Sequence, residues 1–456
     1  MQTVVRAVAR AGETMSAPKA ERSEGTSGTP YGSPAYCWYV LGVLTLVYAL
    51  HALDRGLPNI LIEPVRHEFG LTDSQLGLFS GLAYGLSFAA TVLPIGYLSD
   101  RMNRRKLLAA VVLLWSLLTA FSGMSRSFGQ LVLARVGVGA SEAGAAPLAI
   151  PMVVDIFPSK RRALALGVFW TGPPLGGFVA AALGGYIAAE HGWRAAFFLA
   201  GIPGILVALL LLFTVREPRR GATDPEAAPS ADPPPRFTEA VAFLIRTPAL
   251  ICLIGTVATL SLLSIAMGAW MGSFFIRIHG LTLAQTGLVL GVGGGLCSCI
   301  APALFGWAAD KLAVRDPRWP LRLVMISGLL ALLLTQVTLF ASSVAVAIVG
   351  FILADFVRMG FAPPTISVLM THTPARVRGG VMSILQLASA VIGFGLGPLL
   401  TGMLSDYLGG GAAIKYALVC VSLLFVVAAA LLMLASHLLF GPANRRQPAS
   451  NGAGDG

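Results

Sequence analysis

Twelve apolar stretches alternate with short polar segments along this chain. A helix that crosses a bilayer needs about 20 predominantly apolar residues, and each stretch is of about that length or longer. The expected spans are 36–62, 74–98, 105–124, 128–154, 162–188, 195–214, 249–276, 283–309, 321–341, 344–371, 379–405 and 413–438. The pattern therefore predicts an all-α membrane protein with twelve transmembrane helices.

A polar interruption divides these spans into two groups of six. Residues 215–247 carry a run of Arg, Ala, Asp and Pro, within which 238–245 can form a short surface helix. Both chain ends are polar, and the first lacks the apolar core of a secretory signal. The expected parts are a disordered cytoplasmic tail, a six-helix half, a cytoplasmic linker, a second six-helix half and another disordered cytoplasmic tail: 1–34, 35–214, 215–247, 248–440 and 441–456.

Composition and charge agree with this class. Hydrophobic residues make up 56% and charged residues 12% of the chain, against an average charged share of about 25%. The net charge of +11 is not distributed along the chain as in a nucleic-acid-binding protein. Of the 32 Lys and Arg residues, 24 fall in tails and alternate loops on one side, five on the other side and three inside spans. Because cytoplasmic loops carry the excess of cations, we expect both termini in the cytoplasm, a multi-pass protein of the plasma (inner) membrane, and no nucleic-acid partner.

The two halves resemble each other. Gly306–Lys311 lies 210 residues after Gly96–Arg101, and each segment closes the second span of its half. Pro158–Arg162 precedes the fifth span as Pro374–Arg378 precedes the eleventh. Such spacing indicates an internal repeat and two pseudo-symmetric halves.

Six ionisable residues lie well inside the apolar spans. An ionisable group at the bilayer centre costs at least about 2.5–3.5 kcal/mol, so each one needs a reason. They occupy the first, fourth and tenth spans: Asp54, Arg55, Arg135, Glu142, Asp355 and Arg358. Asp355 follows Glu142 by 213 residues, close to the repeat offset.

Two explanations fit these charges. Carboxylates whose pairing with arginines changes can load and release protons, which assigns proton coupling to Asp54, Glu142 and Arg55. His51 lies one turn from Arg55 on the same face of its span. The alternative is permanent salt bridges that only hold helices together, and the i,i+3 spacing of Asp355 and Arg358 suits that alternative well.

The polar turn Gly96–Lys106, wedged between two apolar spans, resembles the signature loop of the major facilitator superfamily. That resemblance implies alternating access: the first and fourth helices of each half line a central cavity, the second and fifth act as gates, and the third and sixth form an outer scaffold. It implies a conformational role for the residues of this turn: Gly96, Asp100, Arg101, Arg104 and Arg105.

Within that superfamily the chain resembles the spinster-like family. The matching motifs are Asp54-Arg55, Trp115-Ser116, Arg135-Val136-Gly137-Val138-Gly139-Ala140-Ser141-Glu142-Ala143, Gly192-Trp193-Arg194 and Arg216-Glu217-Pro218. The resemblance implies that Asp54, Arg55 and Glu142 form a protonation and gating triad. Ser141 and His51 depart from the family pattern, which usually has Gly and often Asn there, and both lie beside the proposed proton site.

The fifth span holds four residues in a pattern similar to the Gly-Pro-x-x-Gly-Gly signature of facilitator antiporters: Gly172, Pro173, Gly176 and Gly177. Glycines allow two helices to touch, and proline bends a helix, so we assign these residues to conformational gating. Plain small-residue packing would leave the same pattern.

A cavity for substrate is expected between the halves. Its candidate lining residues are polar or aromatic: His51, Arg135, Asp355, Arg358, Trp270 and Phe274. Arginines suit an anionic head group and aromatic rings suit an apolar body. Aromatic side chains near lipid are common in spans, so contact with lipid is an alternative for Trp270 and Phe274.

The sequence lacks the phosphate-binding loop of ATP-driven pumps and the motifs of zinc and serine hydrolases. We therefore expect no enzyme activity, no cofactor and no metal. We predict a monomeric secondary transporter that exports an amphipathic organic anion or lipid-like molecule across the bilayer in exchange for protons. The alternatives are a proton symporter that imports a small organic acid and a non-transporting receptor on the same fold.

Overall fold

The computed structural model describes residues 31–221 and 237–441. The predicted tails and the middle of the predicted linker, residues 1–30, 222–236 and 442–456, lie outside the described residues. Within the described ranges, twelve helices are long and apolar enough to cross a membrane, and every assigned helix or turn belongs to an all-α fold. The predicted fold class is confirmed, and span boundaries agree with the expected ones to within a few residues.

The first half contains spans 1 to 6. Its helices are α2 (Pro34–Ile60), α3 (Ile62–Phe69), α4 (Asp73–Gly77), η1 (Leu78–Leu82), α5 (Ala83–Arg101), α6 (Arg104–Ser122), α7 (Phe128–Glu142), α8 (Ala145–Ile156), α9 (Ser159–Phe169), α10 (Gly172–His191) and α11 (Trp193–Thr214). Spans 2, 4 and 5 each consist of several of these segments in series.

The second half begins with a short helix that precedes spans 7 to 12. Its helices are α12 (Phe237–Ile245), α13 (Pro248–His279), α14 (Leu283–Leu290), η2 (Gly291–Leu296), α15 (Cys297–Ala313), α16 (Trp319–Phe340), α17 (Val344–Met359), α18 (Ala362–Thr371), η3 (Ala375–Val377), α19 (Arg378–Ala388), η4 (Ser389–Leu396), α20 (Gly397–Tyr407), η5 (Gly411–Ala413), α21 (Ile414–Ser422) and α22 (Leu424–Phe440). The helix expected over 238–245 is present as α12.

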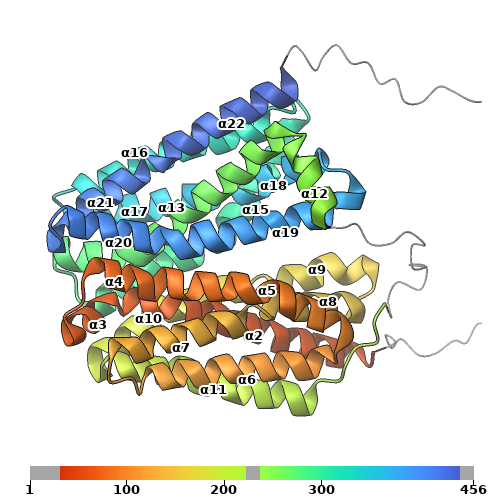
Figure 1. Ribbon diagram of the computed structural model, residues 1–456, viewed down its shortest axis with the longest axis horizontal. Coiled ribbons are helices and arrows are strands. Elements are labelled where there is room, and N and C mark those ends of the chain that lie inside the picture. The colour runs from red at the N-terminus through yellow and green to blue at the C-terminus, as the bar shows by residue number, and fades with distance from the viewer. Residues whose placement is uncertain (1–30, 222–236, 442–456) are drawn as a thin grey trace, which may run out of the picture.

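The halves lie side by side as two helical bundles (Figure 1). One end of the molecule, here called the tail end, contains the start of α2, the α5–α6 turn, α12 and the end of α22. The opposite end, here called the closed end, contains α3, the end of α13 and the α20–α21 connection.

Local sequence signals repeat between the halves. Thr72 and Gln75 form a capping box at the start of span 2, and Thr282 and Gln285 form the same box at the start of span 8. Such boxes satisfy backbone N–H groups that the first helical turn leaves unpaired.

Seven of the described spans are interrupted along their length, including span 12, which breaks at Leu423 between α21 and α22. Spans 2, 8 and 11 contain π-helical segments, η1, η2 and η4. Spans 4, 5 and 10 break at short turns, which lie between α7 and α8, α9 and α10, and α17 and α18. π-Bulges and breaks inside helices cluster at functional sites because they release backbone groups and change helix direction.

Close helix contacts join the halves. Span 2 meets span 11, where a Cβ added to Gly85 would lie 2.6 Å from the backbone nitrogen of Gly395. Span 5 meets span 8, where a Cβ on Gly185 would lie 3.0 Å from the carbonyl oxygen of Leu283. Larger residues at these seams would push the helices apart, so glycine permits the halves to close here.

Candidate functional site

A cavity of about 400 Å³ lies between the halves. It is lined by residues of spans 1, 2 and 5 from the first half and of spans 7, 8, 10 and 11 from the second. Its polar lining residues come from both sides: Tyr48, His51, Arg55, Asn59, Ser80, Tyr84, Ser264, Asp355 and Arg358. Its walls therefore combine cationic side chains with aromatic and aliphatic surface, a composition that suits a ligand with a charged and an apolar part.

Arg55 reaches across the cavity. Its guanidinium carbon lies 3.4 Å from the ring centroid of Phe394, which belongs to η4 in the second half. A cation over an aromatic face is attracted by the negative face of the ring. Arg55 therefore links span 1 to span 11 at the cavity wall.

Behind this wall lies a buried cluster of charges within the first half. Asp54, Arg135 and Glu142 are each at most 2% exposed. Arg135 donates from Nη1 to the backbone carbonyl of Asp54, at 3.2 Å. Neither carboxylate oxygen of Asp54 accepts a hydrogen bond in the described structure, and neither does Oε1 of Glu142. Buried ionised carboxylates without full hydrogen bonding are costly, so this cluster is not a set of saturated salt bridges.

Two side chains connect Glu142 to the cavity. The hydroxyl of Tyr84 donates to Oε2 of Glu142 at 2.7 Å, and Nε2 of His51 lies 3.6 Å from the same oxygen. Tyr84 and His51 both line the cavity, whereas Asp54, Arg135 and Glu142 do not. Sequence analysis placed Arg135 in the cavity lining, which is wrong for this conformation. The carboxylates lie one side chain behind the wall, and Tyr84, which sequence analysis missed, is part of that link.

The second half places one buried ion pair in the cavity wall. Arg358 donates from Nη2 to Oδ1 of Asp355, one helical turn away on α17. Both side chains are at most 6% exposed, and both line the cavity. Oδ2 of Asp355 and Nη1 of Arg358 have no hydrogen-bond partner in the described structure. The pair is therefore held together locally and presents unused polar atoms.

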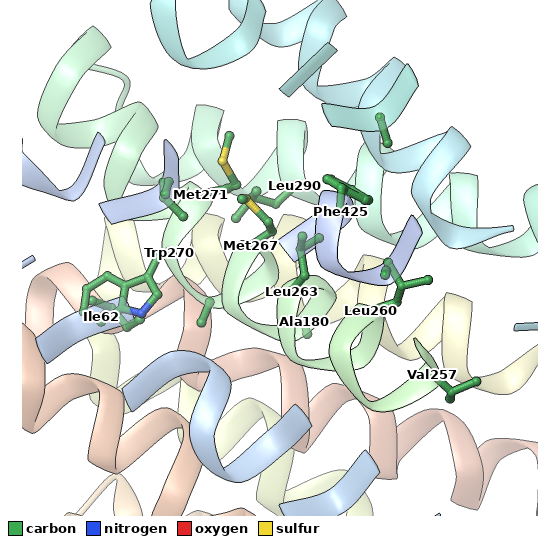
Figure 2. Packing of buried hydrophobic residues seen from close by; sticks show 14 of the residues in the cluster. Ile62, Ala180, Val257, Leu260, Leu263, Met267, Trp270, Met271, Leu290 and Phe425 are labelled. Carbon is green, nitrogen blue, oxygen red and sulfur yellow. The ribbon is translucent and has the colours of Figure 1, made fainter. Parts of the chain in front are cut away.

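Trp270 and Phe274 were predicted to line the cavity, and the structure corrects both assignments. Each is fully buried on α13, and neither belongs to the cavity wall. Trp270 lies in an apolar cluster with Ile62 and Met271 (Figure 2), and its indole N–H donates to the carbonyl of Pro398 at 2.9 Å. The 3.6-residue period of a long buried helix brings apolar positions onto every face, so sequence alone did not show which aromatic residues face the cavity.

An ionic network joins the halves at the closed end. The guanidinium of Arg277, at the end of α13, donates to both carboxylate oxygens of Asp73 at 2.8 Å and to Oε1 of Glu63 at 2.8 Å. Ser405 donates to Asp73 at 2.6 Å, and Asp406 accepts from the backbone N–H of Ser74 at 2.7 Å. Arg277, Asp73 and Glu63 are almost entirely buried. Bidentate arginine–carboxylate pairs are strong and directional, so this network holds the closed end together.

No local pattern in the sequence had predicted this network. Arg277 was only one of the five cations expected on the side with few cations, and no role was predicted for Asp73. The available signal was an acidic residue next to the capping threonine, Thr72, on the side of the membrane that carries few cations.

The basic turn between spans 2 and 3 is fastened within the first half. Arg104 is buried and donates to Asp155 at 2.7 Å, and the backbone N–H groups of Arg104 and Arg105 donate to Glu217 at 3.1 and 2.7 Å. Arg101 lies 4.0 Å from the ring centroid of Tyr97. The side chain of Asp100 lies outside the part that the structure describes, and Gly96 has open space around it.

The predicted gating residues of span 5 divide into two sets. Gly172 and Gly176 face α2, where an added Cβ would meet the backbone of Thr45 or Ala49. Pro173 and Gly177 instead line the cavity. Span 5 therefore packs closely against span 1 on one side and borders the cavity on another.

No group of three or more His, Cys, Asp or Glu residues that could hold a metal ion occurs in residues 31–221 and 237–441. The titratable groups in and behind the cavity wall are carboxylates, guanidiniums, an imidazole and phenols.

Comparison with known proteins agrees with this architecture. The profile of the Major Facilitator Superfamily matches residues 44–391. The chain is 29% identical to an MFS-type efflux pump of Mycolicibacterium smegmatis over 398 residues, covering 86% of this chain and 90% of that protein. It is 27% identical over 418 residues to human protein spinster homolog 1, covering 86% of this chain and 77% of that protein.

A solved structure gives the same result in three dimensions. The crystal structure of a bacterial homolog of the human lysosomal transporter Spinster, in an inward-facing and unoccupied conformation, superposes with a TM-score of 0.81 at 26% identity, covering 92% of this chain and all of that one. With its twelve spans, paired halves and central cavity, this chain belongs to the Major Facilitator Superfamily as a spinster-like membrane transporter.

Proposed function

We propose that this protein is a proton-coupled secondary transporter that exports an amphipathic organic anion or lipid-like molecule by alternating access. One observation carries the proposal: Asp54 and Glu142 are buried with unpaired carboxylate oxygens, and Glu142 touches two residues of the cavity wall. Taking up a proton removes a charge that the interior does not fully satisfy. Releasing that proton restores a carboxylate that can attract Arg135 or Arg55.

The orientation follows from the charge bias. Because 24 Lys and Arg residues fall in tails and loops on the tail side against five on the closed side, the tail end faces the cytoplasm. The ion pairs and close helix contacts described between the halves lie toward the closed end. This arrangement supports an inward-facing conformation in the plasma (inner) membrane, with the cavity reached from the cytoplasm.

The cavity supports the proposed substrate class. Arg55 and Arg358 supply positive charge for an anionic group, and Ile265, Leu290 and Phe351 supply apolar surface. A substrate anion that binds Arg55 would compete with its contact to Phe394, and loss of that contact would loosen span 1 from span 11. Substrate binding and proton loading would then act on the same arginine.

A transport assay with purified protein in liposomes tests the proposal. Fluorescent lysophosphatidylglycerol serves as the amphipathic probe and labelled succinate as the small-acid probe, each with and without a pH gradient. If export is coupled to protons, lysophosphatidylglycerol should move in the direction opposite to proton flow. Collapsing the pH gradient should then stop its net movement. Proton-driven uptake of succinate alone would favour the symporter alternative, which the two arginines of the wall also fit. No movement of either probe, with binding retained, would favour the receptor alternative.

A further inference from the structure

A groove of about 280 Å³ lies at the tail end of the second half, between the start of α16 and the end of α22. These helices are spans 9 and 12. Their outward sides carry exposed apolar residues such as Ile326, Leu329 and Val427, as expected of helices in contact with lipid. The groove has an apolar wall and a polar rim, which consist of Leu321, Met325, Leu432 and Met433 and of Arg318, Arg322, Ser436 and His437.

The rim carries net positive charge. Arg318 donates to the carbonyl of Phe440 at the end of α22, and Arg322 pairs with Asp316 at 3.1 Å. The side chain of Arg322 is 41% exposed, so its guanidinium is only partly used by that carboxylate. His437 stands in the last turn of α22. The rim thus carries two guanidiniums and an imidazole, and the adjacent Asp316 pairs only with the guanidinium of Arg322.

The first half fills the corresponding place with its own carboxylates. Its third and sixth spans are α6 and α11, and the chain that follows α11 turns back under the start of α6. There Glu217 accepts from Arg104 and Arg105, and Asp155 accepts from Arg104. In the second half one described carboxylate serves the two arginines: Asp316 accepts from the backbone N–H of Arg318 at 2.9 Å and from Nη1 of Arg322 at 3.1 Å. The first half has two carboxylates there, Asp155 and Glu217, so an anion from outside the chain would supply the second one in the second half.

We propose that this groove binds the head group of an anionic phospholipid from the leaflet at the tail end. The phosphate lies against Arg318 and Arg322, and an acyl chain follows Leu321, Met325 and Met433 toward the membrane. Guanidinium groups bind phosphate oxygens in a planar, paired geometry, and basic pockets between spanning helices hold anionic head groups. A phosphate dissolved in water would gain nothing from the apolar wall, whereas a lipid uses both parts of the groove. The site is separate from the transport cavity, with which it shares no lining residue.

Native mass spectrometry of the full-length protein in detergent tests this assignment. Phosphatidylglycerol is titrated against phosphatidylcholine with the same acyl chains, and one tightly retained phosphatidylglycerol is expected in preference to phosphatidylcholine. Arg322→Gln removes one cation and should weaken binding about fivefold. Ser436→Glu places a carboxylate inside the groove, as Glu217 does in the first half, and should weaken binding about tenfold or more.

Arg315→Gln is the matched control, because Arg315 is exposed at the same end and does not line the groove. It should retain phosphatidylglycerol as the unaltered protein does. Thermal unfolding without added lipid identifies a variant that fails to fold. If Ser436→Glu fails to fold, Arg322→Gln still tests the proposal. Equal retention of phosphatidylcholine, or unchanged phosphatidylglycerol binding in both groove variants, would overturn the proposal. So would glycerol phosphate binding as tightly as the lipid, since the groove would then be a site for soluble phosphate.

Discussion

The two halves of this transporter share a backbone plan but place their buried charges differently. In the first half, Asp54 and Glu142 lie behind the cavity wall with unpaired carboxylate oxygens. In the second half, Asp355 lies in the wall itself, paired with Arg358 on the next turn of the same helix. Glu142 and Asp355 nearly correspond in the repeat, so the difference comes from their partners. In the described structure, one oxygen of each carboxylate is bonded and the other is not, but Glu142 is bonded by the hydroxyl of Tyr84 and Asp355 by a guanidinium.

The largest effect should come from the first half. Asp54→Asn and Glu142→Gln each remove a group that can gain and lose a proton, so transport driven by a pH gradient should fall at least about a hundredfold, to background. Exchange of substrate across the membrane without a gradient should persist. Accumulation of lysophosphatidylglycerol in liposomes at the rate of the unaltered protein would contradict the proton role.

In the second half, substitution of the buried ion pair should lower the stability of the protein. Asp355→Asn leaves the buried Arg358 without its ionic partner, and breaking such a pair costs about 3–5 kcal/mol. Asp54→Asn, which removes an unpaired carboxylate, should cost far less. Thermal unfolding in detergent measures both. The double variant Asp355→Leu with Arg358→Met should recover much of the loss, because it removes both charges together. Equal destabilisation by Asp355→Asn and Asp54→Asn would remove the distinction between the halves.

The closed end offers a test of how the halves are joined. Arg277→Gln removes three charge-assisted hydrogen bonds between span 7 and residues of the first half, so the equilibrium should shift by about 2–3 kcal/mol toward conformations open at that end. A cysteine introduced at Ser264, in the cavity wall, should then react faster with a membrane-impermeant thiol reagent added outside.

The control for this experiment is Lys415→Gln. Lys415 also lies at the closed end, but its described contacts are with the rings of Phe340 and Tyr416 in the second half. Labelling of the introduced cysteine should not change in this variant. An unchanged rate in Arg277→Gln would mean that the network does not hold the halves closed.

The smallest effect concerns an exposed pair inside the first half. Hydrogen bonds from Arg194 hold the pKa of the Glu68 carboxyl, on α3, below its usual value. A carboxyl with a lowered folded-state pKa stabilises the protein above its unfolded pKa, and this contribution is lost as the pH falls through the folded value. Glu68→Gln should therefore lower stability by about 1 kcal/mol or less at pH 7. The difference from the unaltered protein should shrink on acidification toward pH 3. A difference that grows at low pH would contradict this sign.

Much of the architecture could be predicted from the sequence. The sequence shows the twelve spans directly, because the bilayer requires every span to be long and apolar whatever it packs against. The relation between the halves and the uneven distribution of cations can likewise be read along the chain. The six buried charges were visible for the same reason: Asp54 or Asp355 stands out against an apolar run. The sequence also indicated that Asp355 and Arg358 would meet, since i,i+3 neighbours share a helix face.

What only the tertiary structure decided is which side chains meet across helices. Trp270 and Arg135 were both expected in the cavity lining, yet both lie behind its wall, because the rotation of a buried helix is set by packing and not by its own polarity. Tyr84 reaches Glu142, and Arg277 reaches Asp73, over separations of 58 and 204 residues. Such contacts have no local signature, because each residue alone is an ordinary tyrosine, arginine or carboxylate. The membrane thus determines the fold class through the composition of each span, while the packing of spans against one another determines the site.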